Sequence, residues 1–102
     1  MPPFFIKTNR MVKPVALLGE GLGTFALIMA IMASGSGAIV TGLTLAAIMF
    51  LIGGVSGAHV NPATSVAMFY NGSLSLTELI SYIVMQVLGA LGAVMLYNGT
   101  RA

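Results

Sequence analysis

The polar residues best placed to do chemistry gather in one short stretch, SGAHVNPATS, at residues 56–65. It contains the single histidine of the chain, His59, and an Asn-Pro step at Asn61 and Pro62. Asn61 is suited to the N-cap of a helix, and Pro62 is suited to its first helical position. A helix start presents unpaired N–H groups and a partial positive charge. The stretch therefore predicts a hydrogen-bonding site that favours small neutral molecules over cations.

The remaining residues offer little for catalysis or metal binding. The only acidic residues are Glu20 and Glu78, and the chain has no cysteine. Disulfides and thiolate metal sites are therefore excluded, and one histidine with two distant acids leaves the usual catalytic sets nearly unavailable. We expect no enzyme, no metal and no cofactor. The net charge of +2 is too small to indicate nucleic-acid binding.

The composition indicates a protein whose solvent is mostly lipid. Hydrophobic residues make up 58 % of the chain and charged residues 6 %, and the mean hydropathy is +1.03. A soluble domain carries about 25 % charged residues, so these few charges cannot coat a surface that faces water. We expect an integral, multi-pass, all-α membrane protein with membrane lipid as a partner.

Three apolar runs are long enough to cross a bilayer. They span about residues 15–33, 38–55 and 75–97, and the turns SGSG and NGSL follow the first run and precede the third. A run of about 19 residues makes roughly 28 Å of helix, close to the thickness of the hydrocarbon core. Residues 1–13 form a basic arm, and residues 14–98 form a single three-span unit. Ser75 and Glu78 open the third run with the pattern of a capping box.

A fourth helical segment is too short to span. Residues 62–70, PATSVAMFY, are apolar and end at an Asn-Gly pair, yet they cover only about 13 Å as a helix. We expect a re-entrant half-helix whose preceding loop lines a cavity. Residues 57–60 should be extended there, with their carbonyls forming a ladder of acceptors.

Small residues recur at four-residue spacing along the spans. The pairs are Gly19 with Gly23, Gly53 with Gly57, and Gly89 with Ala93. Such spacings let membrane helices approach closely, so together they predict a compact bundle.

Three stretches of the sequence resemble one known family. SGAHVNPA resembles the signature of the aquaporins, the major intrinsic protein family. GEGLGTFALI resembles the first helix of that family, with Glu20 four residues before Thr24, and ISYIVMQVLGALGAVMLY resembles its third helix, including Gln86. The resemblance covers about residues 15–97. It implies half of an aquaporin-like fold: three transmembrane helices plus one re-entrant half-helix.

The resemblance also implies roles for particular residues. The family pairs two such repeats in inverted orientation, and their Asn-Pro-Ala half-helices meet at the centre. This chain resembles the first repeat, and its pore-lining residues would be Gly57, Ala58, His59, Val60, Asn61, Pro62 and Ala63. Thr64 stands where the second repeat usually has the arginine of the selectivity filter. Family-like spacing makes Thr41, Met49 and Ala58 its neighbours there.

Two roles remain open between alternatives at this point. The resemblance makes Glu20 and Gln86 structural braces, with Glu20 accepting hydrogen bonds from the re-entrant loop; the alternative is a Glu20 that reaches the interface. His59 is a pore-wall residue, a titrating gate or a histidine satisfied inside the fold.

The expected function is a passive channel component for water or small neutral solutes. It would form a pore only with a second inverted repeat, either a second copy or a separate chain, and we expect an oligomer. The alternatives are a small pore-forming or structural membrane protein of the holin kind, or a non-conducting aquaporin fragment. The positive-inside rule places the N-terminus in the cytoplasm and the C-terminus outside, because three basic residues precede the first span (Lys7, Arg10 and Lys13) and only Arg101 follows the third.

Overall fold

The computed structural model describes residues 11–101, and the regular secondary structure in this range is all α-helix. The helices are α1 (Pro14–Ala33), α2 (Ala38–Ser56), α3 (Pro62–Tyr70) and α4 (Leu76–Thr100). The three predicted spans and the half-helix are therefore confirmed; α4 continues three residues beyond the predicted end at residue 97. Most of the predicted basic arm, residues 1–10, lies outside the described residues.

The helix ends follow from local sequence. Pro14 occupies the first turn of α1, where its missing N–H costs nothing. Gly57 ends α2 in the left-handed conformation, with φ of 90°. At the start of α4, the Glu78 N–H donates to Ser75 Oγ at 3.1 Å and the Ser75 N–H donates to Glu78 Oε1 at 2.8 Å, which is the predicted capping box.

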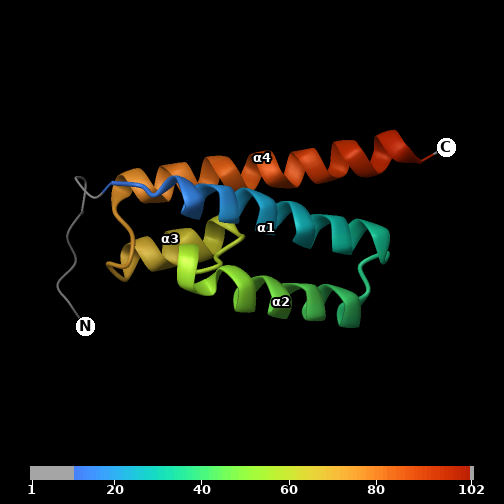
Figure 1. Ribbon diagram of the computed structural model, residues 1–102, viewed down its shortest axis with the longest axis horizontal. Helices are drawn as coiled ribbons and strands as arrows, with labels where there is room; N and C mark the ends of the chain where they lie inside the picture. The colour runs from blue at the N-terminus through green and yellow to red at the C-terminus, as the bar shows by residue number, and fades with distance from the viewer. Residues whose placement is uncertain (1–10, 102) are drawn as a thin grey trace.

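The helices form an elongated bundle with α1 at its centre. α1 packs against α4 and α2, and α3 packs against α4. Figure 1 shows the three long helices running side by side, while α3 covers only part of their length. The lengths and compositions of α1, α2 and α4 suit them to cross a membrane. α3 has nine residues, about 13 Å of helix, so it is too short to do so.

The distribution of polar and apolar residues is the reverse of that in a soluble protein. Phe50 is 89 % exposed and Ile39 is 76 % exposed, whereas Glu20 and Ser65 are fully buried. Hydrocarbon is a good solvent for the exposed side chains and a poor one for polar groups, which therefore collect between the helices. This pattern is that of an integral, multi-pass membrane protein.

Small residues bring α1 and α4 into close contact. A Cβ atom on Gly89 would clash with the backbone oxygen of Gly21, and Ala93, one turn further, is completely buried. On the opposite side of α1, a Cβ on Gly23 would lie 2.8 Å from Val60. The Gly53 and Gly57 spacing is different: a Cβ atom on Gly53 would meet nothing within 4 Å among residues 11–101, so Gly53 does not bring two of the described helices together.

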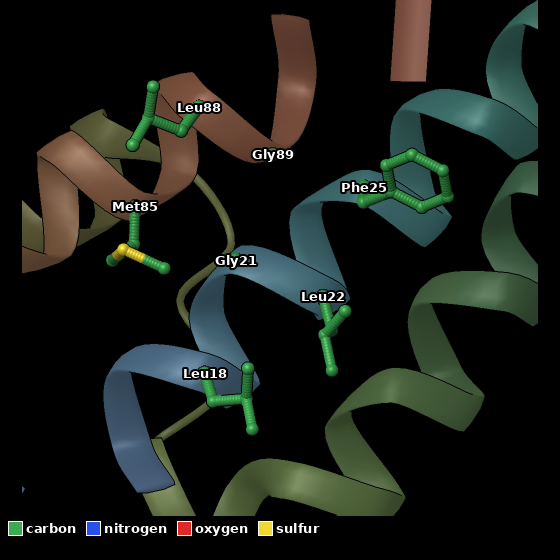
Figure 2. Close-up of a pocket in the computed structure, with 7 residues that line it drawn as sticks. All are labelled: Leu18, Gly21, Leu22, Phe25, Met85, Leu88 and Gly89. Carbon is green, nitrogen blue, oxygen red and sulfur yellow. The ribbon is translucent and has the colours of Figure 1, made fainter. Parts of the chain in front are cut away.

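An apolar hollow lies where the outer surfaces of α1 and α4 meet. Its volume is about 230 Å³. Figure 2 shows its lining: Leu18, Gly21, Leu22 and Phe25 from α1, and Met85, Leu88 and Gly89 from α4. Every described residue that lines it is apolar or glycine.

We expect Gly89→Ala to destabilise the bundle because the added methyl group would force the α1 and α4 backbones apart. Overpacking of this kind costs about 1–3 kcal/mol. Gly92→Ala is the matched control, since its Cβ would meet only the Phe25 ring, at 3.8 Å. Unfolding in detergent should show a lower midpoint for Gly89→Ala and an unchanged or higher one for Gly92→Ala. Equal midpoints would contradict this packing.

Candidate functional site

The centre of the bundle is organised by the carboxyl group of Glu20, which accepts four hydrogen bonds. Its Oε2 accepts from the Ser56 hydroxyl at 2.6 Å and from the His59 N–H at 3.0 Å. Its Oε1 accepts from the Val60 N–H at 2.8 Å and from Gln86 Nε2 at 2.9 Å. Glu20 is fully buried, so the alternative in which it reaches the interface is wrong. This geometry supports its role, and that of Gln86, as braces of the loop.

The loop between α2 and α3 turns sharply and is not extended as expected. Gly57, Ala58 and Val60 have φ values of 90°, 51° and 47°. This left-handed region is unfavourable for residues other than glycine, and most of all for a β-branched one such as Val60. Such strain costs of order 1–3 kcal/mol per residue and persists only where the surroundings hold it. Here the bonds from Ser56 and Glu20 hold it.

The same bonds determine which way the loop carbonyls point. The Ala58 N–H donates to Ser56 Oγ at 3.1 Å, and the next two N–H groups donate to Glu20. In a planar trans peptide, an N–H and the preceding carbonyl point in opposite directions, and the described residues contain no cis peptide. The Gly57 carbonyl therefore points away from Ser56 Oγ, and the Ala58 and His59 carbonyls point away from Glu20, so carbonyl acceptors face the outer side of the loop although the loop is turned.

A second layer of hydrogen bonds ties the loop to α3 and α4. Ser65 Oγ lies 2.9 Å from His59 Nδ1 and accepts from Gln86 Nε2 at 2.8 Å. The Tyr82 hydroxyl donates to the Ser56 carbonyl at 2.7 Å, which satisfies an otherwise open carbonyl at the end of α2. The His59 ring also lies 5.1 Å from the Tyr82 ring, centroid to centroid. These contacts support the alternative in which His59 is satisfied inside the fold.

Sequence reasoning missed three members of this network: Ser56, Ser65 and Tyr82. A signal for them existed, because a hydroxyl within a lipid-embedded segment has to find a protein partner. The pairing of Ser65 with His59 does not make a nucleophile. Ser65 is fully buried, so a substrate cannot reach its hydroxyl.

The α3 tip is built as predicted. The Ala63 N–H donates to Asn61 Oδ1 at 2.7 Å, so Asn61 is the N-cap. Asn61, Pro62 and Ala63 are all exposed. The cap uses only the oxygen of the Asn61 side chain, so its amide NH₂ group can still donate.

A groove of about 260 Å³ borders the tip. Asn61 and Pro62 line it together with residues of α1 and α4. The remaining lining residues are Thr24, Leu27, Ile28, Ile31, Val60, Gln86, Val87 and Ala90. Exposed hydrogen-bonding groups thus lie beside a mostly apolar groove near the middle of the spans.

The four residues predicted for the selectivity filter lie in different parts of the fold. Thr41 lies in the first turn of α2, about 22 Å along the axis from Ser56 at its other end. Met49 is an exposed residue midway along α2, and Ala58 is a buried residue of the loop. Thr64 lies in the first turn of α3. Thr41 and Ala58 lie near opposite ends of α2. That the four residues surround one constriction therefore stays a prediction, and it applies to an assembled pore.

We expect Glu20→Leu to be far more damaging than Glu20→Gln. Leucine leaves the His59 and Val60 N–H groups unpaired, and each such group costs about 1–3 kcal/mol. Glutamine keeps one acceptor oxygen, and the Ser56 hydroxyl can reverse to accept from the new amide, so one backbone N–H is lost. The measurement is unfolding in detergent. Glu78→Gln is the control, because glutamine also completes a capping box; a Leu variant as stable as the wild type would count against the brace.

Comparison with known proteins identifies the family that this sequence resembles. Residues 7–102 match the family model described as Major intrinsic protein. The lens fiber major intrinsic protein of Lithobates pipiens is 47 % identical over 66 residues, which are 64 % of this chain and 25 % of that protein. Its counterpart in Ovis aries is 45 % identical over 64 residues, 62 % of this chain and 24 % of that protein.

A bacterial relative gives the same result. Aquaporin Z of Brucella melitensis biotype 1 is 45 % identical over 56 residues, which are 55 % of this chain and 25 % of that protein. The matched stretch thus spans about a quarter of the length of these relatives. No solved structure matches the chain. Since the family model covers nearly the whole chain, this protein belongs to the major intrinsic protein family.

Proposed function

We propose that this chain forms one wall of a transmembrane pore that passes water or small neutral solutes. The family consists of channels and not of enzymes, and relatives of this chain are named aquaporins. The chain spans only a part of those relatives, so the pore is completed by a second, inverted repeat. That repeat is either another copy of this chain or a separate segment, and the complete pore belongs to an oligomer.

The observation that carries the proposal is the direction in which the N–H and carbonyl groups of the loop between α2 and α3 point. Three backbone N–H groups point inward at Ser56 and Glu20, so three carbonyls point outward, and the capping Asn61 keeps an amide donor free beside them. A row of acceptors ending at a donor can replace the hydrogen bonds that water loses on leaving bulk solvent. The positive end of α3 disfavours cations at the same level.

The residues we assign to the pore wall follow from this arrangement. Gly57, Ala58 and His59 contribute carbonyls, Val60 contributes the turn into the half-helix, and Asn61, Pro62 and Ala63 contribute the tip. Thr64 follows the tip, where an arginine would narrow the pore and fix a positive charge. With threonine there, we propose a constriction wide enough for small polyols, with Thr41, Met49 and Ala58 as its other members.

The orientation we propose has the N-terminus in the cytoplasm. The start of α1 and the end of α4 lie at opposite ends of the bundle (Figure 1), and Lys13 caps the first while Arg101 caps the second. Two more basic residues, Lys7 and Arg10, precede Lys13. Basic residues are retained on the cytoplasmic side, so the re-entrant segment enters the membrane from that side.

Labelling of single cysteines from outside the cell tests this orientation. The chain has no cysteine, so Pro3→Cys and Ala102→Cys each introduce a unique site. A membrane-impermeant maleimide added to intact cells should label residue 102 and should label residue 3 only after the cells are opened. If only residue 3 is labelled in intact cells, the N-terminus lies outside and the proposed orientation is wrong.

We expect liposomes that contain the folded chain to pass both water and glycerol faster than empty liposomes. Stopped-flow light scattering measures both, first with the chain alone and then with the second half of an aquaporin added. Ala63→Trp should abolish both fluxes, because it fills the exposed tip of α3. Leu88→Trp is the control of equal size, because Leu88 lies in the apolar hollow of Figure 2.

Three outcomes separate the parts of this proposal. If neither preparation passes water or glycerol faster than empty liposomes, although the protein is inserted and folded, the proposed channel function is wrong. A structural or lytic role is then favoured. If water passes and glycerol does not, the channel stands and the wide constriction inferred from Thr64 is wrong. If Leu88→Trp blocks as strongly as Ala63→Trp, the pore does not run past the tip.

A further inference from the structure

Val60 lies between the helices and the groove beside the α3 tip. Its side chain lines the groove together with Asn61 and Pro62, although it is only 4 % exposed. It also packs in an apolar cluster with Ile48 and Ile52 of α2. Val60 therefore forms a part of the groove surface whose position depends on the side chains packed behind it.

The residue of α1 that faces Val60 is Gly23. A Cβ atom on Gly23 would lie 2.8 Å from Val60 Cγ1. The same atom would lie 3.0 Å from Ile52 Cδ1 and 3.2 Å from Ile48 Cγ2. Carbon atoms in contact are normally about 3.5–4.0 Å apart, so a larger residue fits at position 23 only if a neighbour moves. The described residues that line the groove do not include Gly23, so it acts on the groove through Val60.

The backbones on both sides of this contact are held in place. On the opposite side of α1, the Gly21 backbone lies so close to α4 that a Cβ on Gly89 would clash with it. Glu20, three residues before Gly23, accepts from the Val60 N–H at 2.8 Å. Moving α1 away from Val60 would therefore press α1 against α4 and stretch this bond. The side chains have to take up any volume that is added at position 23.

The side chain of Val60 has one way to yield. Its only flexible dihedral is χ1, and its backbone is held in the left-handed region with φ of 47°. Ile48 and Ile52 occupy the space behind it, and protein interiors are too closely packed to accept another methyl group without movement. A methyl group of Val60 that is displaced by a bulkier residue 23 therefore moves toward the open groove.

We propose that Gly23 sets the width of the pore beside Asn61, because it lets the Val60 side chain lie back against α1 and α2. Gly23 is thus a positioning residue for the size of the solute. This inference rests on the proposed function in one respect, that solutes pass along the groove. It adds a determinant of solute size behind the pore surface, and it gives Gly23 a role beyond the helix packing predicted from its spacing with Gly19.

Flux measurements on Gly23→Ala test the effect on solute size. The ratio of glycerol flux to water flux should fall by about tenfold, because one methyl group in an apolar site has about this effect on discrimination. The ratio is the informative quantity, since a loss of folded protein lowers both fluxes equally. Gly19→Ala is the matched control one turn earlier on α1. Its Cβ would meet only Ile52, at 3.7 Å, so the ratio should not change.

A second substitution tests whether Val60 transmits the effect. Val60→Ala in the Gly23→Ala background removes the methyl groups that the new methyl group displaces, so the flux ratio should return at least to the wild-type value. Alanine also tolerates the left-handed backbone better than a β-branched residue. Val55→Ala is the control for this step, because Val55 is 42 % exposed on α2 and its truncation should restore nothing.

The position of the Val60 side chain can be measured without any flux. In protein labelled with carbon-13 at the valine methyl groups and held in detergent, the Val60 signals are those that Val60→Ala removes. Gly23→Ala should shift these signals and change the χ1 rotamer that three-bond couplings report. Gly19→Ala should change neither.

Each result decides the inference. A ratio that falls with Gly23→Ala and returns with Val60→Ala, together with a changed Val60 rotamer, supports it. An unchanged ratio, an unchanged rotamer or a failure of Val60→Ala to restore the ratio overturns it, while the proposed pore stands because the wild type still conducts. If the wild type conducts neither solute, the proposed function is wrong and this inference is wrong with it. If Gly23→Ala does not fold, Val60→Ala alone replaces it: a wider groove should raise the ratio, and an unchanged ratio overturns the inference.

Discussion

The structure depends on one constraint. Backbone N–H and C=O groups that form no hydrogen bond within a helix need another partner in the protein, because hydrocarbon has no hydrogen-bonding groups. The five residues between α2 and α3 are such a segment, and the Glu20 carboxyl group accepts hydrogen bonds from their backbone. Its two oxygens accept from the loop backbone, from the end of α2 and from α4. One side chain of α1 therefore contacts α2, the loop and α4 directly, and it is linked to α3 through Gln86, which also donates to Ser65.

That arrangement explains why strained backbone is found where the function is proposed. Ala58 and Val60 adopt left-handed conformations that cost of order 1–3 kcal/mol each. The bonds to Glu20 and Ser56 offset this cost and turn the N–H groups inward. The outward carbonyls are the consequence, so the acceptors of the proposed pore are set by a carboxyl group that itself lies on the other side of the loop.

The close packing of α1 serves the same end. Gly21 and Gly89 let α4 approach closely enough for Gln86 to reach Glu20, and Gly23 leaves room for Val60 on the opposite side. The bundle nonetheless leaves some polar groups without partners among the described residues. Its tip is exposed, its groove is open, and Thr24 and Gln86 retain unpaired oxygens within the described chain.

The sequence by itself determined the class, the spans, the half-helix and the Asn61 cap. These depend on hydropathy, segment length and residues within four positions of one another, all of which a linear pattern carries. It also pointed to Glu20 and Gln86, though only through family resemblance. Tertiary structure alone decided that Ser56, Ser65 and Tyr82 complete the network and that the loop is turned and not extended. It also decided that Gly53 and Gly57 do not pair in packing. The physical reason is that these outcomes depend on hydrogen bonds and contacts between residues as far apart as 20 and 86, and no local propensity records which distant donor a buried acceptor will meet.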